Sequence, residues 1–483
     1  MPPRLKHSAG ARVQPGLTVL TRPTPDDPAR GSGHGFQVAF SHPLCRCPDL
    51  RFAVVERSQH PKNQRKSEFF GQHALDLIKT AIPQSQLWPG SRLSEQFKFY
   101  GNDDIVAIIG WPGAGEANNE ALAWGMSLGT DRHVVLVLPE ERASATLQRL
   151  PWIKTDVEVW AYNPTDPAGV VSAAIPSKHE VLGQIHDWGP RGAGYSLERV
   201  DDETLSRTLF HEKAAWVESL VGWVNTHHHD LAPRHRGHDL IWKSMGRQVL
   251  RISRHRGGLR ILACTRYSKP RSDQQKPPPP LDLLSELTDE QCGALKATIE
   301  TAITNRQPGG SDGGHEEHRL QHTIQDEFEL TGRLFDLTLL TAEFPSWRPG
   351  HQPGLIDFLG AAPPGPPHIV ETKLDNYLML TLQGLDYWMW AKANPELVAA
   401  SLSEQVSGTP VIDFVVGAHK TTTAIGPYTR HQVESLDDEV EWRFHVVKDW
   451  RTSLSVITFR TRQMPEVPFA SIPMPSPFFA RQP

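Results

Sequence analysis

The sequence predicts an α/β protein with an N-terminal doubly wound domain, a basic intermediate segment and a C-terminal domain built on a mixed sheet. Three observations support this fold class. The chain has 483 residues, enough for two or three domains that each bury a core. Strand-like and helix-like runs alternate along its first third, which is typical of parallel sheets. Lysine and arginine are concentrated in one stretch between the two predicted domains.

Composition places the boundaries of these parts. Residues 1–39 are rich in Pro, Gly, Arg and Ser and have no sustained period, which predicts a mobile arm. The N-terminal domain is expected over 40–180, the intermediate segment over 181–305 and the C-terminal domain over 306–470. Residues 471–483 are expected to form a Pro-rich tail.

The four cysteines are too few and too scattered for a disulfide framework, which indicates a reducing compartment; they are Cys45, Cys47, Cys264 and Cys292. The chain has no run of eighteen apolar residues and no charged-then-apolar leader. We therefore expect a cytoplasmic protein with no membrane partner.

The N-terminal domain alternates between the two kinds of element. Its expected strands are Arg51–Glu56, Asp104–Gly110, His133–Pro139 and Val157–Tyr162, and its expected helices are Ser67–Ala81 and Asn118–Leu128. Such alternation predicts a parallel, doubly wound sheet. In sheets of this kind, a turn of small residues between a strand and a helix is where phosphorylated ligands bind.

The turn after Asp104–Gly110 reads WPGAGEANNE and has this character. It resembles the PGGxGTxxE signature of the SLOG superfamily, which includes nucleotide-binding sensors, nucleotide phosphoribohydrolases and, more distantly, nucleoside deoxyribosyltransferases. The resemblance implies a Rossmann-like domain whose ligand-binding residues are Pro112, Gly113, Gly115 and Glu120.

This turn departs from the signature at three positions. Ala114 replaces a glycine, while Glu116 and Ala117 replace the Gly-Thr pair that faces phosphate. A carboxylate at Glu116 would repel phosphate unless it turned away. Ligand sensing and a purely structural role are therefore favoured over N-glycosidic catalysis by Glu120, and an ordinary helix-start loop is the remaining alternative.

The intermediate segment contains a helical stretch, Leu205–Asn225, and then most of the excess positive charge. From Arg234 to Arg271 there are eleven Lys or Arg and one acid, Asp239, so the local charge is 11 − 1 = +10. Two strands are expected here, Ile241–Ser253 and Leu259–Tyr267, followed by a helix over Leu281–Asn305.

This basic hairpin has two readings. Arg247, Arg251 and Arg260 can form a face suited to a phosphate backbone, and Trp242 can stack on the bases of a single strand. Alternatively, the basic residues are solvated or dock on an acidic surface of the same protein. Nucleic acid, with DNA expected rather than RNA, is the favoured partner.

The stretch HQPGLIDFLGAAPPGPPHIVETK carries the chemistry of the C-terminal domain. Two short apolar runs, Gly354–Leu359 and His368–Val370, read as strands joined by a Pro-rich turn, and we expect them to pair antiparallel. Asp357 lies within the first run, while Glu371 and Lys373 follow the second on one face of a strand.

A carboxylate within an apolar strand needs a partner, and a metal ion is a natural one. Asp357, Glu371 and the backbone carbonyl of Thr372 are the predicted ligands of Mg²⁺ or Mn²⁺. Lys373 would hold the attacking water and offset charge that builds on the phosphate.

A helix expected over Tyr377–Asn394 follows, with Gln383 and Tyr387 on one face. At this point the chain resembles the PD-(D/E)XK nuclease superfamily, particularly its RecB-like branch with an ExK strand and a QxxxY helix. The resemblance covers roughly 310–465 and implies a mixed sheet flanked by helices. It also makes Glu317 a candidate on the preceding helix, expected over His315–Asp326. Ile356 stands where the family often has proline.

Three further strands, Pro410–Gly417, Glu441–Val447 and Ser453–Phe459, are expected to complete the sheet. The leading hypothesis is a metal-dependent nuclease controlled by a nucleotide ligand, an architecture that by analogy suits prokaryotic defence. A second is an N-terminal nucleotide or nucleoside glycosidase with a C-terminal nucleic-acid-binding domain, and a third is a repair or restriction-type nuclease without ligand control. Whether the chain forms homo-oligomers is left open.

Overall fold

The chain divides into two compact units, residues 1–76 and 77–483, which are described separately. The computed structural model describes residues 20–23, 36–39, 52–54, 69–70, 73–83, 87–89, 94, 96–189, 215–228, 231, 233–236, 239–255, 258–263, 281–283, 287–306, 316–374, 377–417, 427–448, 450 and 455–460. One helix, α2 (Ala74–Ala81), crosses the boundary between the units.

The first unit contains a three-stranded antiparallel sheet. Its strands are β1 (Leu20–Pro23), β2 (Phe36–Ala39) and β3 (Phe52–Val54). The first two lie inside the range 1–39, so the prediction of an arm without regular structure is wrong for these two segments. The rest of that range and the predicted tail 471–483 lie outside the described residues.

The second unit begins with a six-stranded sheet whose strands follow one another in sequence order. They are β4 (Trp88–Pro89), β5 (Phe97–Gly101), β6 (Ile105–Gly110), β7 (His133–Pro139), β8 (Val157–Asn163) and β9 (Asp166–Ser172). Only β6, β7 and β8 run parallel to one another; β5 and β9 pair antiparallel at the flanks. The three central strands agree with the predicted ones, but the sheet is mixed.

The doubly wound arrangement predicted for this sheet is not observed. Helices α3 (Glu120–Leu128) and α4 (Glu140–Arg149) connect β6 to β7 and β7 to β8, and the strand order never reverses. Right-handed connections that advance in one direction leave both helices on the same face of a sheet. The alternation of strands and helices in the sequence predicts that neighbouring strands pair parallel. It does not predict at which edge of the sheet each new strand is added.

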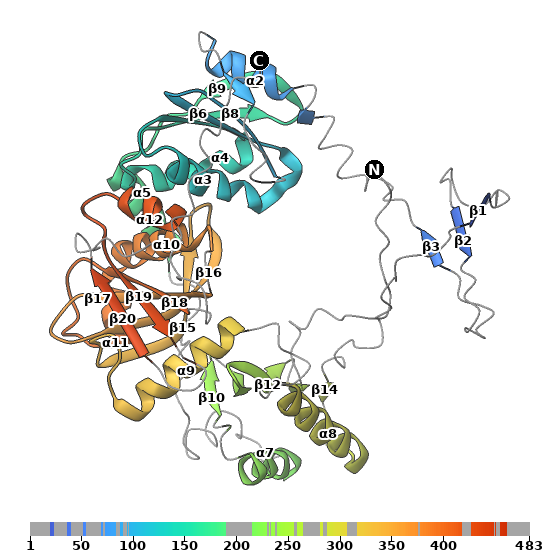
Figure 1. Cartoon of the computed structure of the whole chain (residues 1–483). Coiled ribbons are helices and arrows are strands. Elements are labelled where there is room, and N and C mark those ends of the chain that lie inside the picture. The colour runs from blue at the N-terminus through green and yellow to red at the C-terminus, as the bar shows by residue number, and fades with distance from the viewer. Residues whose placement is uncertain are drawn as a thin grey trace. The chain divides into compact units, whose positions relative to one another are not determined.

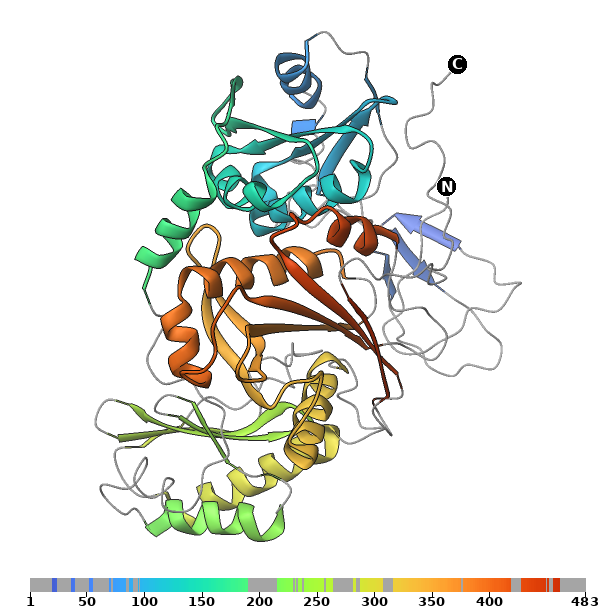
Figure 2. The same cartoon turned by 90° about the vertical axis from the view of Figure 1, so that its left-hand side faces the viewer.

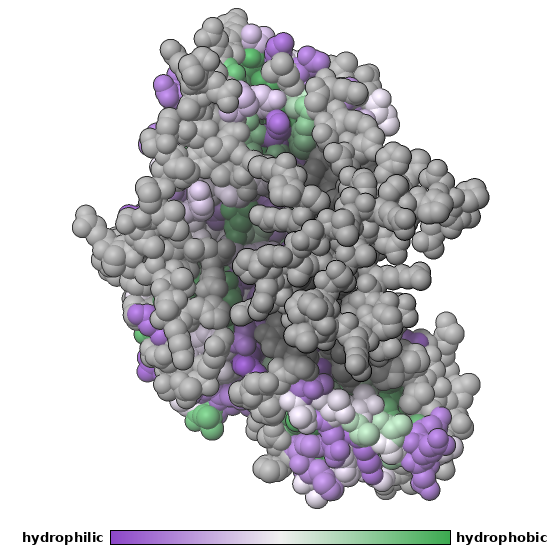
Figure 3. Space-filling model, turned by 45° about the vertical axis from the view of Figure 1, so that its right-hand side comes forward, coloured by the Kyte–Doolittle hydropathy of each residue, from purple (hydrophilic) through white to green (hydrophobic). Residues whose placement is uncertain are grey.

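The intermediate segment forms a five-stranded antiparallel sheet. Its strands are β10 (Arg234–Arg236), β11 (Asp239–Ser244), β12 (Arg247–His255), β13 (Gly258–Ala263) and β14 (Leu281–Leu283). One face packs with α7 (Ala215–His227) and α8 (Asp289–Arg306) in a core that includes Trp242, Leu250 and Ile299. Hydrophilic side chains gather where α8 faces solvent (Figure 3).

Two predicted boundaries in this segment are wrong. The strand expected over Ile241–Ser253 is a hairpin, because Met245 and Gly246 both adopt positive φ, 48° and 75°, and reverse the chain between β11 and β12. The helix expected over Leu281–Asn305 starts only at Asp289, and its first residues form β14 instead.

The C-terminal sheet has six strands in sequence order: β15 (Leu339–Arg348), β16 (Gln352–Ala361), β17 (Pro367–Leu374), β18 (Val411–Gly417), β19 (Glu441–Lys448) and β20 (Ser455–Arg460). Strands β17, β18 and β19 are parallel, while the other neighbours are antiparallel. The predicted mixed sheet and the antiparallel pairing of β16 with β17 are confirmed.

Helices cover both faces of this sheet (Figure 1). Helix α9 (Glu316–Thr331) packs on one face through Leu320 and Ile324, beside Val370. Helices α10 (Leu380–Ala393), α11 (Pro395–Leu402) and α12 (Pro427–Glu434) lie on the other face, where Ile369 points. The side chains of alternate residues of β17 therefore point to opposite faces of the sheet.

The two six-stranded sheets share a single apolar core. Buried side chains of α3 and α4 belong to the same cluster as those of α10 and α12, and these helices lie between the two sheets in Figure 2. Gln432 of α12 donates to the carbonyl of Ala123 in α3, at 3.0 Å. Helix α5 (Lys178–Asp187) also packs on α10. Within the described ranges no helix is long and apolar enough to cross a bilayer.

Candidate active site

The candidate catalytic residues lie where β16, β17 and α9 meet. Strand β17 is buried along nearly its whole length and places Glu371 and Lys373 on the same face, two residues apart. Asp357 lies on β16, one residue before the stretch that pairs with β17. Glu317 lies in the first turn of α9, which contacts β17.

Lys373 is the centre of this cluster. Its Nζ donates to Glu317 Oε1 at 2.8 Å, to Glu371 Oε1 at 2.9 Å and to the carbonyl of Thr372 at 2.9 Å. The Glu371 side chain is 3% exposed and that of Lys373 11% exposed. Three of the predicted catalytic residues are thus in direct contact.

Asp357 joins the cluster through Thr372. Its Oδ2 accepts the Thr372 backbone N–H at 2.8 Å and the Thr372 hydroxyl at 2.6 Å. Gln321 of α9 donates to the same hydroxyl oxygen at 2.9 Å. The sequence analysis did not single out Gln321, although its position one turn after Glu317 was an available signal.

We define the acidic cluster as Asp357, Glu317, Glu371 and Lys373. Counted as ionised groups, its three carboxylates and one ammonium give −3 + 1 = −2. Burial and then the charge of Asp357 raise the pKa of Glu371 to about 8, although Lys373 opposes the shift. Burial alone would lower the pKa of Lys373, but the carboxylates of Glu371, Asp357 and Glu317 hold it well above its ordinary value.

The acidic cluster fits a divalent cation in charge and in donor type. Glu371 Oε2 is buried and has no hydrogen-bond partner among the described residues, so it can accept a cation. The described part of the chain contains no ready-made set of three or more His, Cys, Asp or Glu ligands. Asp357, Glu371 and the Thr372 carbonyl are the groups that would hold an ion. In this structure Asp357 accepts hydrogen bonds from Thr372, while Glu371 and the Thr372 carbonyl accept them from Lys373.

Helix α10 lies next to the acidic cluster. A Cβ on Gly354 of β16 would come within 2.7 Å of Tyr387 Cε1, so only glycine lets the Tyr387 ring pack there. Burial and then the charge of Glu371 raise the pKa of Tyr387. Gln383, one turn earlier, is half-buried, and its Oε1 has no hydrogen-bond partner within the described ranges.

The N-terminal turn differs from the predicted phosphate site. Pro112 to Asn119 form a 3-10 helix that runs directly into α3, and the Glu120 N–H already bonds the carbonyls of Ala117 and Asn118. The Glu120 amide is therefore used internally and is not available to a phosphate. Nucleotide binding at this turn stays a prediction that its geometry does not favour.

Packing within the turn explains its glycines. A Cβ on Gly113 would meet the Trp111 ring at 2.2 Å, and Gly115 adopts a φ of 57° that side chains rarely allow. Asn118 closes the loop by donating to the carbonyls of Trp111 and Gly115, both at 3.2 Å. These residues have structural reasons to be present.

Glu120 lies near the C-terminal domain. Burial raises the pKa of Glu120, and burial followed by the charge of Glu120 raises the pKa of Tyr377, which follows β17. Lys373 Nζ lies 5.6 Å from the centre of the Tyr377 ring. Tyr377 is therefore close to the acidic cluster.

The predicted nucleic-acid contacts of the basic hairpin need correction. Trp242 is fully buried in the core of the intermediate sheet and cannot stack on a base. Arg247 is also buried. A β-bulge at Trp242 and Lys243 interrupts the regular alternation of side chains, and both Val249 and Leu250 are buried. The Arg247 carbonyl accepts from Arg306 at 3.2 Å.

Arg251 and Arg260 keep the shared face that was predicted for them. Ser253 pairs with Arg260 and lies two residues from Arg251 on the same strand. Arg251 forms an ion pair with Asp239 at 2.9 Å and is 40% exposed. These two arginines remain candidates for phosphate contact.

Sequence reasoning missed two cations of the same segment. Arg234 pairs with Glu329 of α9 at 2.8 Å, and Lys243 pairs with Glu343 of β15 at 2.7 Å. The alternative reading, in which the basic segment docks on an acidic surface of the same protein, therefore describes these two residues. Their only signal was membership of the stretch with charge +10.

Comparisons of the chain with protein-family models, with curated proteins and with solved structures found no match.

Proposed function

We propose that the protein is a metal-dependent nuclease that hydrolyses phosphodiester bonds, of DNA in the first place, with Mg²⁺ or Mn²⁺. The observation that carries the proposal is the meeting of three carboxyl groups, those of Asp357, Glu317 and Glu371, around the single ammonium of Lys373, in a site where Glu371 is almost fully buried. Burial raises the pKa of Glu371 to about 8, and a divalent cation bound by oxygen atoms would stabilise its ionised form.

Each residue has a role in this proposal. Glu371, Asp357 and the Thr372 carbonyl would hold the cation, which would polarise a phosphate and lower the pKa of an attacking water. Lys373 would donate a proton of its ammonium group to a hydrogen bond with the phosphate oxygen on which charge develops. Glu317 keeps Lys373 in place through its 2.8 Å bond, and Gln321 and Thr372 fix Asp357.

The alternative of an N-terminal glycosidase has less support. Its candidate catalytic residue, Glu120, follows a turn that is wound into a 3-10 helix. By contrast, the acidic cluster brings together residues from helix α9 and from both strands of the β16–β17 hairpin. We therefore place the chemistry in the C-terminal domain.

The test is a cleavage assay on plasmid DNA, linear duplex DNA, single-stranded DNA and RNA with Mg²⁺, Mn²⁺ or EDTA. Glu371→Gln, Asp357→Asn and Lys373→Ala should each lower the cleavage rate by about 100-fold or more. Lys154→Ala, which changes an exposed lysine far along the chain from these motifs, is the matched control and should cleave normally.

Lys373→Ala should lower turnover more than affinity, since its charge is needed most in the transition state. Thermal melting must show that each variant is folded. Cleavage that persists in EDTA, or full activity of the folded Glu371→Gln variant, would refute the proposal.

A further inference from the structure

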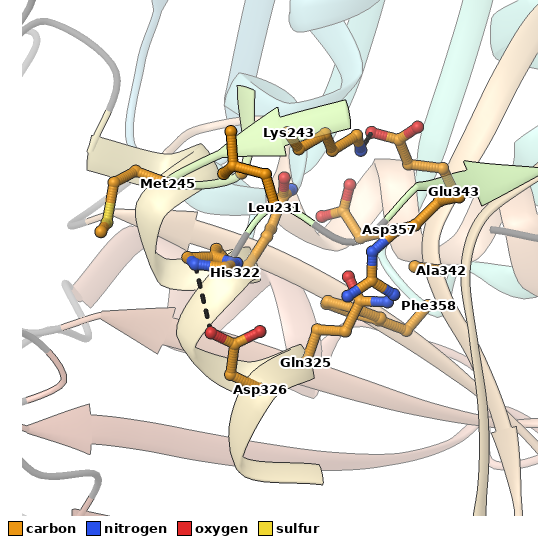
Figure 4. A pocket seen from close by; sticks show the side chains of 13 residues that line it. Leu231, Lys243, Met245, His322, Gln325, Asp326, Ala342, Glu343, Asp357 and Phe358 are labelled. Carbon is orange, nitrogen blue, oxygen red and sulfur yellow. Dashed lines mark hydrogen bonds and ion pairs between the residues drawn. The ribbon is translucent and has the colours of Figure 1, made fainter. Parts of the chain in front are cut away.

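A cavity of about 210 Å³ lies beside Asp357, between the intermediate sheet and the C-terminal sheet (Figure 4). Arg234 and Lys243 line it from the intermediate sheet, His322 and Asp326 line it from α9, and Glu343 and Asp357 line it from β15 and β16. One wall therefore comes from the basic segment, and the opposite wall carries a member of the acidic cluster.

Three contacts hold the basic wall in place. Lys243 bonds Glu343 and Arg234 bonds Glu329, and all four side chains are at least 70% buried. The turn between β11 and β12 rests on α9, where a Cβ on Gly246 would come within 2.0 Å of the His318 carbonyl oxygen. The intermediate sheet thus covers Asp357, and we call this covering part of the sheet the roof.

The backbone next to Asp357 is unusual. Register pairs Ala342 with Phe358 and Phe344 with Ile356, so Glu343 stands opposite Asp357. Glu343 has a φ of 52°, which is sparsely populated for residues other than glycine and is typical of functional sites. This conformation accompanies the presentation of its carboxylate to Lys243.

The size of the cavity limits what can enter. A double helix, whose major and minor grooves alone are roughly 12 Å and 6 Å wide, is far larger than this cavity. It cannot enter a 210 Å³ space whose roof touches α9. A single strand presents one phosphate at a time and is bound by grooves with cations along the backbone.

We propose that this cavity is a phosphate subsite for single-stranded nucleic acid, with Lys243 and Arg234 as the phosphate contacts, and that the roof keeps duplexes away from Asp357. The inference rests on the proposed nuclease function. A bound phosphate would take the place of Glu343 as the partner of Lys243, so the subsite exchanges an internal ion pair for a substrate contact. The shared chemistry is the phosphodiester backbone, which DNA and RNA strands both supply.

The first measurement is binding in EDTA, so that no cleavage occurs. Fluorescently labelled single-stranded DNA, single-stranded RNA and a blunt duplex of the same sequence are titrated with the full chain while anisotropy is recorded. A single strand of at least one type should bind at least about tenfold more tightly than the duplex.

Lys243→Gln should weaken binding of the single strand and reduce the slope of log affinity against log salt by about 0.7, the loss of one phosphate contact on a single strand. Lys154→Gln is the matched control, because Lys154 is 46% exposed and pairs with Asp438 instead of lining the cavity. It should change neither quantity.

The second measurement is cleavage of the same three substrates with Mn²⁺. Wild-type protein should cut the single strand at least about tenfold faster than the duplex. Equal cleavage of both substrates, or an unchanged affinity and salt slope in folded Lys243→Gln, would overturn the single-strand subsite while leaving the nuclease proposal intact. Preferential single-strand binding without cleavage of any substrate would refute the nuclease proposal and retain the subsite.

Discussion

Arg149 and Asp386 form a buried bidentate ion pair that joins the end of α4 to the middle of α10. Arg149 Nε lies 2.6 Å from Asp386 Oδ1 and Nη2 lies 2.8 Å from Oδ2, with both side chains at most 3% exposed. Asp386 directly precedes Tyr387, whose ring packs on β16. The pair therefore ties the N-terminal part of the shared core to the helix beside the acidic cluster.

Arg149→Met should lower the free energy of unfolding by about 3–5 kcal/mol, because it leaves the Asp386 carboxylate buried without a partner. Urea unfolding followed by circular dichroism measures this change. Lys154→Met is the control, since Lys154 and Asp438 also form an ion pair between distant parts of the chain but are 46% and 75% exposed. Its cost should stay below about 1 kcal/mol. Equal costs for the two variants would show that the buried pair does not stabilise the interface.

A second buried network gives the fold a defined acid sensitivity. Asp413 of β18 accepts from His368 Nδ1 at 2.5 Å and from His445 Nε2 at 2.7 Å. Burial alone would raise the pKa of Asp413, but these two hydrogen bonds lower it to about 2 from an ordinary 3.8. Below about pH 4 the unfolded chain binds the proton first, so this contribution is complete above pH 4 and is lost as the pH falls toward 2.

The contribution of Asp413 should be about 2 kcal/mol, since each unit of pKa shift corresponds to about 1.4 kcal/mol. Asp413→Asn should therefore flatten the fall of melting temperature between pH 4 and pH 2. Asp336→Asn changes a carboxylate that is 59% exposed and should keep the wild-type slope. A wild-type slope in folded Asp413→Asn would assign the acid sensitivity to other groups.

Gly384 tests how tightly α10 packs on the sheet. A Cβ there would lie 2.5 Å from Phe414 Cε1 and 2.9 Å from Ile412 Cγ2. Gly384→Ala should lower the free energy of unfolding by up to about 2 kcal/mol, because overpacking costs about 1–3 kcal/mol and the gain in helix propensity is about 1 kcal/mol.

Gly293 of α8 is the matched control, since a Cβ there meets nothing within 4 Å. Gly293→Ala should raise the free energy of unfolding by about 0.5–1 kcal/mol. Stabilisation by both alanines would mean that α10 can move away from Phe414 at little cost.

The parts predicted from sequence are those encoded by nearby residues. The two-residue spacing of Glu371 and Lys373 fixes their common face on a strand, and the Pro-rich turn favours the pairing of β16 with β17. The antiparallel hairpin then brings Asp357 beside Thr372. Local periodicity also located β7 and the start of α9.

The parts that could not be predicted depend on contacts between distant segments. Met245-Gly246 is not one of the usual hairpin dipeptides. The turn between β11 and β12, which packs on α9, could therefore not be predicted from the sequence. Ile241 and Trp242 are both buried, so both faces of β11 are covered. An alternation of apolar and polar residues, which marks a strand with one buried face, does not predict this. The partners of Lys243 and Arg234 lie roughly a hundred residues further along.

The most direct test of the nuclease proposal is a calorimetric titration of Mn²⁺ into the metal-free full chain at pH 7. One ion should bind at the acidic cluster and release a proton, because Glu371, with a pKa raised to about 8, must ionise to become a ligand. Affinity should therefore rise with pH up to about 8. Proton release is measured by repeating the titration in buffers of different ionisation enthalpy.

Glu371→Gln should lower the Mn²⁺ affinity by at least about tenfold and abolish the proton release, since the amide offers no charge. Glu396→Gln, at an exposed position in the first turn of α11, should bind as wild type does. If the wild-type chain binds no Mn²⁺, or if folded Glu371→Gln binds it with unchanged affinity, the acidic cluster is not a metal site and the proposed mechanism is wrong.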